Sequence, residues 1–308
     1  MTESTQPLGK IFESYPFIAP EKYTGTLKGK VVIVTGASAG IGKAIATAFA
    51  RAGASVAAVA RREDNLNTLV KETTADGGHA IAVVGDVSKR GGPKEIVAKV
   101  EATLGPIDIL VNNAGIARLG PLEMEDEDLD IWWRVHEVNV RAPVTLIRAV
   151  LPGMMERKSG IVMTVSSNVA TLDLPTMSAY NSSKAAVSKF HEAITHELEG
   201  SGITSFAVHP GQIPSELGQA DGAINTASLN HFAVKRFMAG IQDGGPRQTP
   251  ESAADTMVAL AADPRSKVLH GHHVNADQDL EAVLKEAEKE GKGRIGKEQL
   301  YKVRIGQL

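Results

Sequence analysis

A tyrosine and a lysine stand four positions apart at Tyr180 and Lys184, in a stretch whose spacing predicts a helix over residues 178–199. Side chains at i and i+4 share one helix face, with about 5–6 Å between their Cβ atoms. A free phenol has a pKa near ~10, and a neighbouring ammonium group favours the phenolate. The pair is therefore suited to proton transfer near neutral pH, although most pairs with this spacing are ordinary surface residues.

A glycine-rich turn follows the first apolar run and precedes a stretch of helical periodicity. Its residues are Gly36, Ser38, Ala39, Gly40, Ile41 and Gly42, in the pattern T-G-x-x-x-G-I-G rather than G-x-G-x-x-G. Glycines allow the turn to be tight and the backbone to approach a pyrophosphate, which binds the unpaired N–H groups at the start of the helix. Because a strand precedes the turn and a helix follows it, the sequence predicts a dinucleotide site.

Further motifs follow this turn in a fixed order. They are Asp86-Val87, Asn112-Asn113-Ala114-Gly115, Asn139, Ser167, the Tyr180/Lys184 pair and Pro210-Gly211. Together with the glycine turn, they resemble the short-chain dehydrogenase/reductase family, and the resemblance covers residues 30–275. The aromatic and Pro-rich N-terminus and the charged C-terminal tail also resemble a subgroup common in fungal metabolism.

The resemblance implies a role for each residue of the catalytic group. Tyr180 would exchange a proton with the substrate oxygen, and Ser167 would hydrogen-bond the same oxygen. Lys184 would also bind the nicotinamide ribose, and Asn139 would anchor a water that relays protons towards the lysine. The neighbouring Ser166 would point the other way, because adjacent residues of a strand face opposite sides.

The same resemblance extends the cofactor site along the cleft. Asp86 would bind the adenine amino group, and Val87 would pack on the ring. Further cofactor contacts would come from Asn113, Ala114, Gly115, Tyr180, Lys184, Pro210, Gly211, Ile213 and Ser215.

The end of the second predicted strand bears on the choice of cofactor. NAD sites normally carry a carboxylate there for the ribose 2′-OH, whereas this strand ends in Ala60, followed by Arg61 and Arg62. A guanidinium fork suits a 2′-phosphate, and Ser38 would add a hydroxyl. We therefore expect NADP (NADPH) in preference to NAD. The competing interpretation is that both arginines are solvated and pair with the acidic residues after them.

Short apolar runs alternate with stretches of helical periodicity from residue 30 onwards. Nearly continuous apolar runs are typical of strands buried on both faces of a parallel sheet. The expected strands are 31–35, 55–60, 80–84, 107–112, 160–165, 204–208 and 268–275, and the expected helices are 40–51, 62–74, 93–104, 126–155, 178–199 and 250–262. This alternation predicts a Rossmann-type, doubly wound α/β fold, with a seven-stranded parallel sheet and helices on both faces.

We expect one catalytic domain over residues 28–276, between an N-terminal extension (1–27) and a C-terminal helical extension (277–308). The first extension lacks periodicity, so it is either an extended arm over the domain or disordered. The second carries an apolar stripe typical of a helix packed on its own domain. Residues 211–245 also lack periodicity and are expected to form a long functional loop.

Composition excludes several classes of protein. The 308 residues include no Cys, which excludes a disulfide scaffold, a thiolate metal site and a cysteine nucleophile. A net charge of −3 lacks the basic excess of a nucleic-acid binder. No apolar stretch approaches the roughly 18 to 20 residues of a membrane span and no signal peptide is evident, so we expect a cytoplasmic protein.

A metal site would need further ligands beside the histidines near the end of the domain, which are His270, His272 and His273. No matching ligand is evident elsewhere in the sequence. We therefore assign these histidines to the last strand and its turn, and we expect no metal.

The substrate would bind beyond the carboxyl ends of the strands, against residues 116–119, 168–174 and 212–240. These segments are mostly apolar, which favours a neutral, moderately hydrophobic carbonyl compound or alcohol. Arg118 would either recognise an acidic substituent or be solvated.

The leading hypothesis is therefore an NADP-dependent oxidoreductase acting on a ketone or secondary alcohol. The alternatives are an NAD(P)-binding sensor or scaffold without turnover, and an epimerase or dehydratase without net redox change. The intact catalytic group argues against the first alternative, and the lack of room for a larger substrate domain argues against the second. The resemblance also implies a homodimer or homotetramer, assembled through the helices at 126–155 and 178–199.

Overall fold

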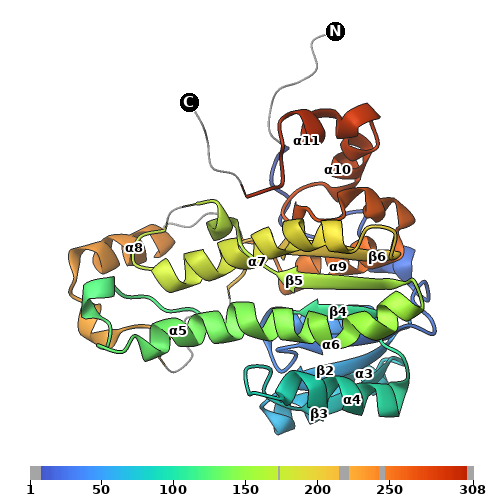
Figure 1. Ribbon diagram of the computed structural model, residues 1–308, viewed down its shortest axis with the longest axis horizontal. Helices are drawn as coiled ribbons and strands as arrows, with labels where there is room; N and C mark the ends of the chain where they lie inside the picture. The colour runs from blue at the N-terminus through green and yellow to red at the C-terminus, as the bar shows by residue number, and fades with distance from the viewer. Residues whose placement is uncertain (1–7, 173, 215–221, 243–246, 304–308) are drawn as a thin grey trace.

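The computed structural model describes residues 8–172, 174–214, 222–242 and 247–303, and it contains one seven-stranded parallel sheet (Figure 1). The strand order is β3-β2-β1-β4-β5-β6-β7, so the order reverses between β1 and β4. The strands are β1 (Val31–Thr35), β2 (Ser55–Ala60), β3 (His79–Val84), β4 (Ile109–Asn112), β5 (Gly160–Val165), β6 (Ile203–His209) and β7 (His273–Asn275). The predicted Rossmann-type fold is confirmed.

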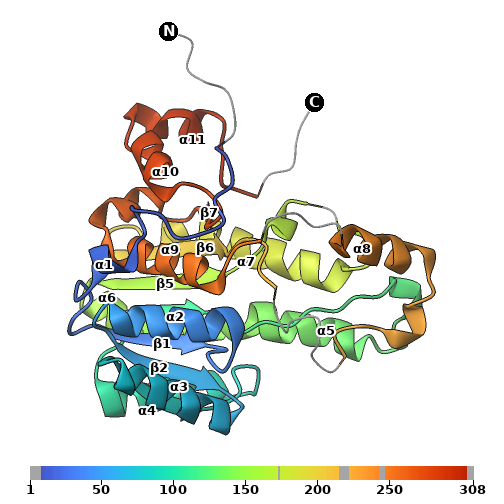
Figure 2. The same ribbon diagram turned by 180° about the vertical axis from the view of Figure 1, so that it is seen from behind.

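Helices cover both faces of the sheet (Figures 1 and 2). One hydrophobic cluster joins the sheet to α2 (Gly40–Arg51), α3 (Glu63–Ala75) and α9 (Pro250–Ala262). A second cluster joins the other face to α4 (Gly92–Leu104), α6 (Ala142–Glu156) and α7 (Ser178–Glu197). The strands are thus buried on both sides, as their continuous apolar runs predict.

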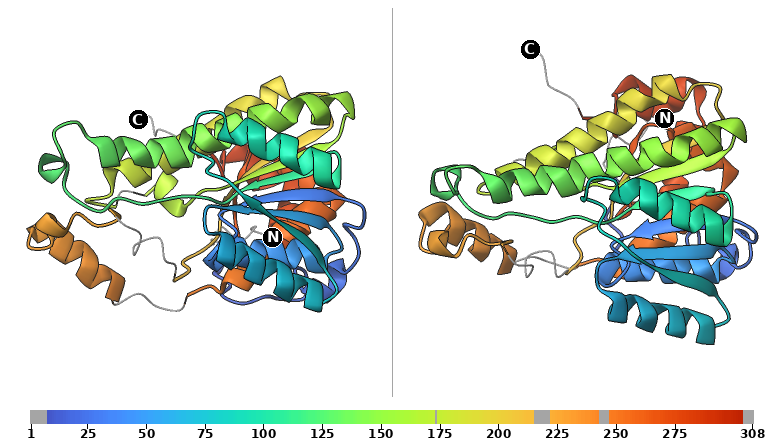
Figure 3. Two further views of the ribbon diagram at one scale, coloured as in Figure 1. Left: turned by 90° about the horizontal axis from the view of Figure 1, so that it is seen from below. Right: turned by 60° about the horizontal axis from the view of Figure 1, so that its bottom comes forward.

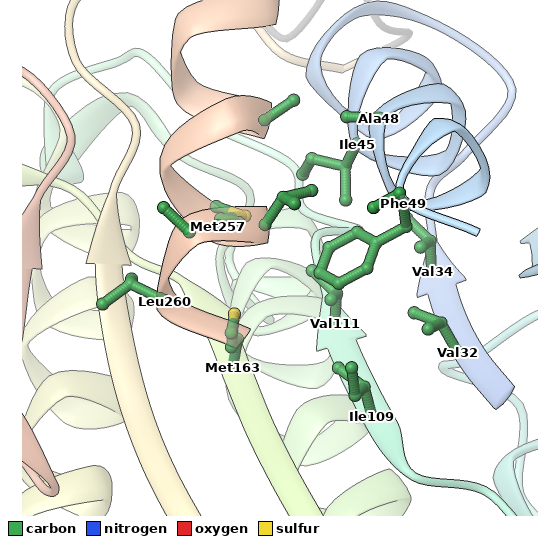
Figure 4. Close-up of a cluster of buried hydrophobic side chains, with 14 of the residues drawn as sticks. Val32, Val34, Ile45, Ala48, Phe49, Ile109, Val111, Met163, Met257 and Leu260 are labelled. Carbon is green, nitrogen blue, oxygen red and sulfur yellow. The ribbon is translucent and has the colours of Figure 1, made fainter. Parts of the chain in front are cut away.

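The first cluster centres on the contact between α2 and α9 (Figure 4). Phe49 of α2 lies between α9 and the strands, and it is fully buried. Met257 of α9 and Val111 of β4 complete the layer around it. Each side chain buried in this way contributes roughly 1.5–3 kcal/mol to folding. This packing fixes the start of α2, and therefore the glycine turn, against the carboxyl ends of the strands.

The helix expected over residues 126–155 is interrupted. The structure has α5 (Asp130–His136), a π-helical turn η2 (Glu137–Arg141) and then α6. Pro143 accounts for the break, because it has no N–H to donate to the carbonyl of Asn139, its partner in a continuous α-helix. The π turn therefore places Asn139 in an irregular stretch, a feature frequent at functional sites.

Two other predictions of secondary structure are wrong. Residues 211–245 are not all loop, because η5 (Thr226–Ser228) and α8 (Phe232–Gln242) lie among the described residues of this stretch. Figure 3 shows α8 projecting beyond the sheet. The last strand is confined to β7, because the residues before it form the 3₁₀ turn η6 (Pro264–Leu269), which begins at a proline. The remaining expected elements agree to within two residues at each end.

The described residues near each end of the chain pack on the first cluster. The N-terminal arm, by which we mean residues 8–27, includes the short helix α1 (Pro20–Tyr23) and buries Phe17, Ile18 and Tyr23. At the other end, α10 (Leu280–Ala287) and α11 (Gly293–Lys297) bury apolar side chains in the same cluster. The described part of the arm is therefore ordered on the domain.

None of the helices in the described ranges combines the length and the apolar character that a membrane span needs.

Candidate active site

A cleft of about 1660 Å³ opens at the carboxyl ends of the strands, where the strand order reverses between β1 and β4. Open α/β sheets bind their ligands at this point. Every described site residue predicted from the sequence lines the cleft, with the exception of Asn139: Gly36, Ser38, Ala39, Gly40, Ile41, Gly42, Arg61, Arg62, Asp86, Val87, Asn113, Ala114, Gly115, Ser167, Tyr180, Lys184, Pro210, Gly211 and Ile213. Ser215, also predicted, lies outside the described residues.

Tyr180 and Lys184 lie one turn apart near the start of α7, where they face the end of β5. The Nζ of Lys184 is 5.5 Å from the centre of the Tyr180 ring. This buried ammonium group donates a hydrogen bond of 2.7 Å to the carbonyl of Val165, the last residue of β5. Two residues further on, the Ser167 side chain lies close enough to Tyr180 to lower the pKa of the phenol. The helix and the strand end thus bring the three side chains of the predicted catalytic group together.

Burial is the main influence on the protonation of Tyr180 and Lys184. Burial raises the pKa of Tyr180 to about 12, against the opposing effect of the Ser167 side chain. Burial also lowers the pKa of Lys184 to about 8. Both shifts favour the neutral form, because removal from water disfavours charge. The Nζ of Lys184 is hydrogen-bonded to a backbone carbonyl rather than to the phenol oxygen.

Asn139 lies behind the cleft wall and connects two parts of the site. Its Oδ1 accepts a hydrogen bond from Ile116 N at 2.9 Å, and its Nδ2 donates to Ile116 O at 2.9 Å. The same Nδ2 donates to the Ser183 hydroxyl at 3.0 Å, on α7. A Cβ atom on Gly115 would lie 3.3 Å from Asn139 Oδ1 and 3.6 Å from Lys184 Nζ. Asn139 therefore fixes the connection after β4 against the catalytic helix.

The turn after β1 contains three glycines, and the structure accounts for them in different ways. A Cβ atom on Gly36 would lie 2.9 Å from the Cα of Ala114, and one on Gly42 would lie 2.2 Å from the Gly36 carbonyl oxygen. Neither position has room for a side chain, because the turn packs against the segment after β4. Gly40 instead has a φ of +53° and open space where a side chain would be. The glycine turn therefore leaves open space at Gly40.

The start of α2 has the properties that a phosphate group requires. Its N-cap residue is Ala39, which has no side chain to cap the first N–H groups of the helix. These donors and the positive end of the helix dipole lie beside the open space at Gly40. The residues present therefore fit the pyrophosphate of a dinucleotide.

Basic side chains gather at the other end of the cleft. Arg62 donates to the Ser38 hydroxyl from Nε at 3.2 Å and from a terminal nitrogen at 3.1 Å. Arg61 is exposed at the cleft edge. Burial acts to raise the pKa of Asp86, but hydrogen bonds from Ser88 and the charges of two arginines, Arg134 and Arg61, hold that pKa below its usual value. Because Arg134 lies on α5, no motif in the sequence predicts its place in the cleft.

Arg118 has neither of the two roles expected for it. It is buried, and its guanidinium group binds the Glu125 carboxylate with contacts of 2.6 to 2.9 Å. It also donates to the carbonyl of Gly222 at 2.8 Å. Arg118 is therefore a structural residue rather than a solvated or substrate-binding one.

Helix α8 contributes the outer wall of the cleft through Phe232, Arg236 and Phe237. Phe232 is 78% exposed, which is unusual for so large an apolar side chain. Its position suits contact with a ligand that has apolar surface. Within the described segments, no cluster of three or more His, Asp or Glu side chains is arranged to hold a metal ion.

The fold and the cleft define a nucleotide-binding α/β protein with a serine, a tyrosine and a lysine grouped at one end of its binding site. The family model described as short chain dehydrogenase matches residues 30–224. A short chain dehydrogenase of the fungus Pseudocercospora fijiensis is 59% identical over 298 residues, covering 97% of this chain and 96% of that protein. The chain belongs to the short-chain dehydrogenase family and is an oxidoreductase.

Solved structures of the same family are similar in fold. A gluconate 5-dehydrogenase from Burkholderia cenocepacia, in complex with NADP and tartrate, has a TM-score of 0.70 at 26% identity, covering 85% of this chain and 98% of that one. A metagenomic short-chain oxidoreductase in complex with NADP has a TM-score of 0.62 at 29% identity, with 77% and 92% covered. Nicotinamide nucleotides thus bind to close structural relatives of this fold.

Proposed function

We propose that the protein is an NADP(H)-dependent oxidoreductase that transfers hydride between the nicotinamide and a ketone or secondary alcohol of a moderately hydrophobic small molecule. One observation carries this proposal: Tyr180, Ser167 and Lys184 meet in the same cleft as an open glycine turn. The apolar residues of α8 support a substrate with apolar surface.

In the reduction direction, Tyr180 donates its phenolic proton to the carbonyl oxygen of the substrate. The Ser167 hydroxyl donates a hydrogen bond to the same oxygen and fixes its position. The cofactor, when bound, supplies the hydride. Because burial favours the neutral phenol, Tyr180 holds its proton until the oxygen gains negative charge. A protonated Lys184, one helical turn away, then stabilises the phenolate that remains.

Three features support NADP over NAD. Ala60 takes the place of the carboxylate that would repel a 2′-phosphate. Arg61 and Arg62 lie at the same end of the cleft, and Arg62 already holds the Ser38 hydroxyl. The solved relatives described above hold NADP.

Arg61→Asp tests this assignment. The ratio of kcat/KM for NADPH to that for NADH should fall by at least about tenfold, because a carboxylate repels the 2′-phosphate and accepts hydrogen bonds from a free diol. Arg51→Asp, at an exposed position at the end of α2, is the matched control and should leave the ratio unchanged. An unchanged ratio in Arg61→Asp contradicts the assignment.

A panel of ketones with NADPH tests the reaction class. We expect net loss of reduced cofactor with at least one moderately hydrophobic ketone. Cofactor binding without any turnover across the panel would instead indicate a sensor or scaffold. Conversion of a substrate without net loss of NADPH would indicate an epimerase or dehydratase.

We also propose that the protein forms a homodimer or homotetramer through α5, α6 and α7. Trp133 of α5 is 55% exposed, and Ile131 beside it is 37% exposed. On the same helix, Trp132 stacks on His136 and donates to the Ser178 hydroxyl of α7 at 2.9 Å. An exposed aromatic face of this kind is typical of a subunit contact.

A further inference from the structure

Gln248 connects the cleft to the N-terminal arm. It is 3% exposed and lies two residues before α9. Its Oε1 accepts a hydrogen bond from Gln212 N at 2.6 Å, and its backbone N–H donates to Gln212 O at 3.1 Å. Its Nε2 donates to the carbonyl of Ile11 at 3.1 Å. One buried side chain thus joins the loop after β6 to a segment more than two hundred residues away in sequence.

The loop after β6 also packs tightly against this side chain. Gly211 has a φ of +97°, and a Cβ atom there would lie 2.6 Å from the side-chain carbonyl group of Gln248. Pro210, Gly211 and Gln212 all line the cleft. The position of Gln248 therefore sets the position of this part of the wall.

The N-terminal arm is itself held by the C-terminal segment (Figure 2). Ile11 N donates to Asp277 O at 2.8 Å, and Lys10 forms an ion pair of 3.4 Å with the Asp277 carboxylate. Further along the arm, the Tyr15 hydroxyl accepts a hydrogen bond from Leu280 N at 2.6 Å. These contacts fix the carbonyl of Ile11 that Gln248 binds.

We infer that Gln248 is a positioning residue for the wall of the cleft formed by residues 210–212, and that the N-terminal arm holds Gln248 in place. The inference rests on the proposed function in one respect, that this wall lies beside the nicotinamide half of the bound cofactor. An apolar side chain at position 248 leaves the Gln212 N–H and the Ile11 carbonyl without their partners. The wall then loses its fixed position relative to Tyr180, whereas the adenosine end of the cleft is unaffected.

Two ligands distinguish effects at one end of the cleft from effects at the other. NADPH contacts both ends, whereas adenosine 2′,5′-bisphosphate carries the 2′-phosphate but no nicotinamide. We expect Gln248→Met to weaken NADPH binding about tenfold and to leave bisphosphate binding unchanged, as measured by titration calorimetry on the full chain. The matched control is Gln299→Met, because Gln299 is an exposed glutamine that donates a hydrogen bond of 2.7 Å to the carbonyl of Gly296. This control should change neither affinity.

Ile11→Pro tests the part played by the arm. Proline removes the N–H that binds Asp277 O, so NADPH binding should weaken by a smaller factor while bisphosphate binding stays the same. Retained bisphosphate binding shows that each variant is folded. If Gln248→Met does not fold, Gln248→Glu replaces it, because it keeps an acceptor for Gln212 and loses the donor to Ile11.

Each remaining outcome has a distinct meaning. Unchanged NADPH affinity in the position 248 variant, or equal losses for both ligands, overturns the positioning role. An effect at position 248 with none from Ile11→Pro overturns the role of the arm. Failure of the unsubstituted protein to bind either ligand contradicts the proposed function instead.

Discussion

Tyr180 and Lys184 share one helix face, and burial shifts the pKa values of both towards the neutral form. For the tyrosine this is the protonated state that donates a proton during reduction. For the lysine it means that the charge on the ammonium group is present at neutral pH but is lost in mild alkali. Burial therefore sets the pKa values of the pair. The carbonyl of Val165 accepts the hydrogen bond that keeps the lysine in place.

The lysine gives a prediction about stability. Its pKa is about 8 in the folded protein and 10.5 in an exposed lysine, so between these values the unfolded chain binds more protons. The free energy of unfolding should therefore rise with pH across this window, by about 2 kcal/mol between pH 8 and 9.5. Urea unfolding of the unsubstituted protein and of Lys184→Met measures this rise, which should be absent from the variant. If the free energy of unfolding rose equally with pH in both proteins, the lysine would not be buried as described.

At the scale of the elements, the side chain of Arg118 holds the connection after β4. Arg118 binds Glu125, whose side chain is 1% exposed, and also reaches the carbonyl of Gly222. Leu119 beside it pairs with Ile224 in an isolated β-bridge. One guanidinium group thus joins two long connections at the rim of the cleft.

Arg118→Met should destabilise the protein by about 3 kcal/mol, because it leaves the Glu125 carboxylate buried without a partner. The matched control is Arg141→Met, which removes an ion pair with Glu137 whose two side chains are each 42% exposed. The control should cost less than about 0.5 kcal/mol. Chemical denaturation checks both variants, and equal effects would contradict the structural role of Arg118.

The sequence predicts the regular elements well because they depend on local patterns, and the residues named by the family resemblance line the cleft where the structure describes them, with the exception of Asn139. It fails where a distant contact or a single proline decides the outcome. The break in the helix around Asn139 comes from Pro143, and the burial of Arg118 depends on Glu125 meeting it in space. Helix α8 does carry a sequence signal, because Val234, Phe237, Met238 and Ile241 recur at the spacing of one helix face. The helix could therefore have been predicted from this pattern.

At the scale of the whole molecule, the N-terminal arm and the helices α10 and α11 belong to the same hydrophobic cluster as α2 and α9. Contacts between residues near position 11 and residues near position 277 have no signature in sequence, which is why the purpose of the two tails could not be predicted. In the structure, the N-terminal arm contacts the C-terminal segment directly and is connected to the loop after β6 through Gln248.

The proposed subunit contact makes a prediction at this scale. Trp133→Glu places a charge on the exposed aromatic face, so the oligomer should dissociate towards monomers. Val84→Glu, at an exposed apolar position at the end of β3, is a control for the addition of charge outside the proposed contact. Sedimentation velocity of both variants and the unsubstituted protein checks this. An unchanged oligomer in Trp133→Glu, or a monomeric unsubstituted protein, would contradict the proposed contact.

The central claim is that Tyr180 is the proton donor in an NADPH-dependent reduction. The most direct measurement is the single-turnover rate of NADPH oxidation by the unsubstituted protein and by Tyr180→Phe, with a ketone that the panel identifies. Tyr180→Phe should lower this rate by about 10² to 10⁴-fold while NADPH binding stays within a few fold, because the ring remains and only the acid is lost. A variant that oxidises NADPH at the unsubstituted rate would contradict the account.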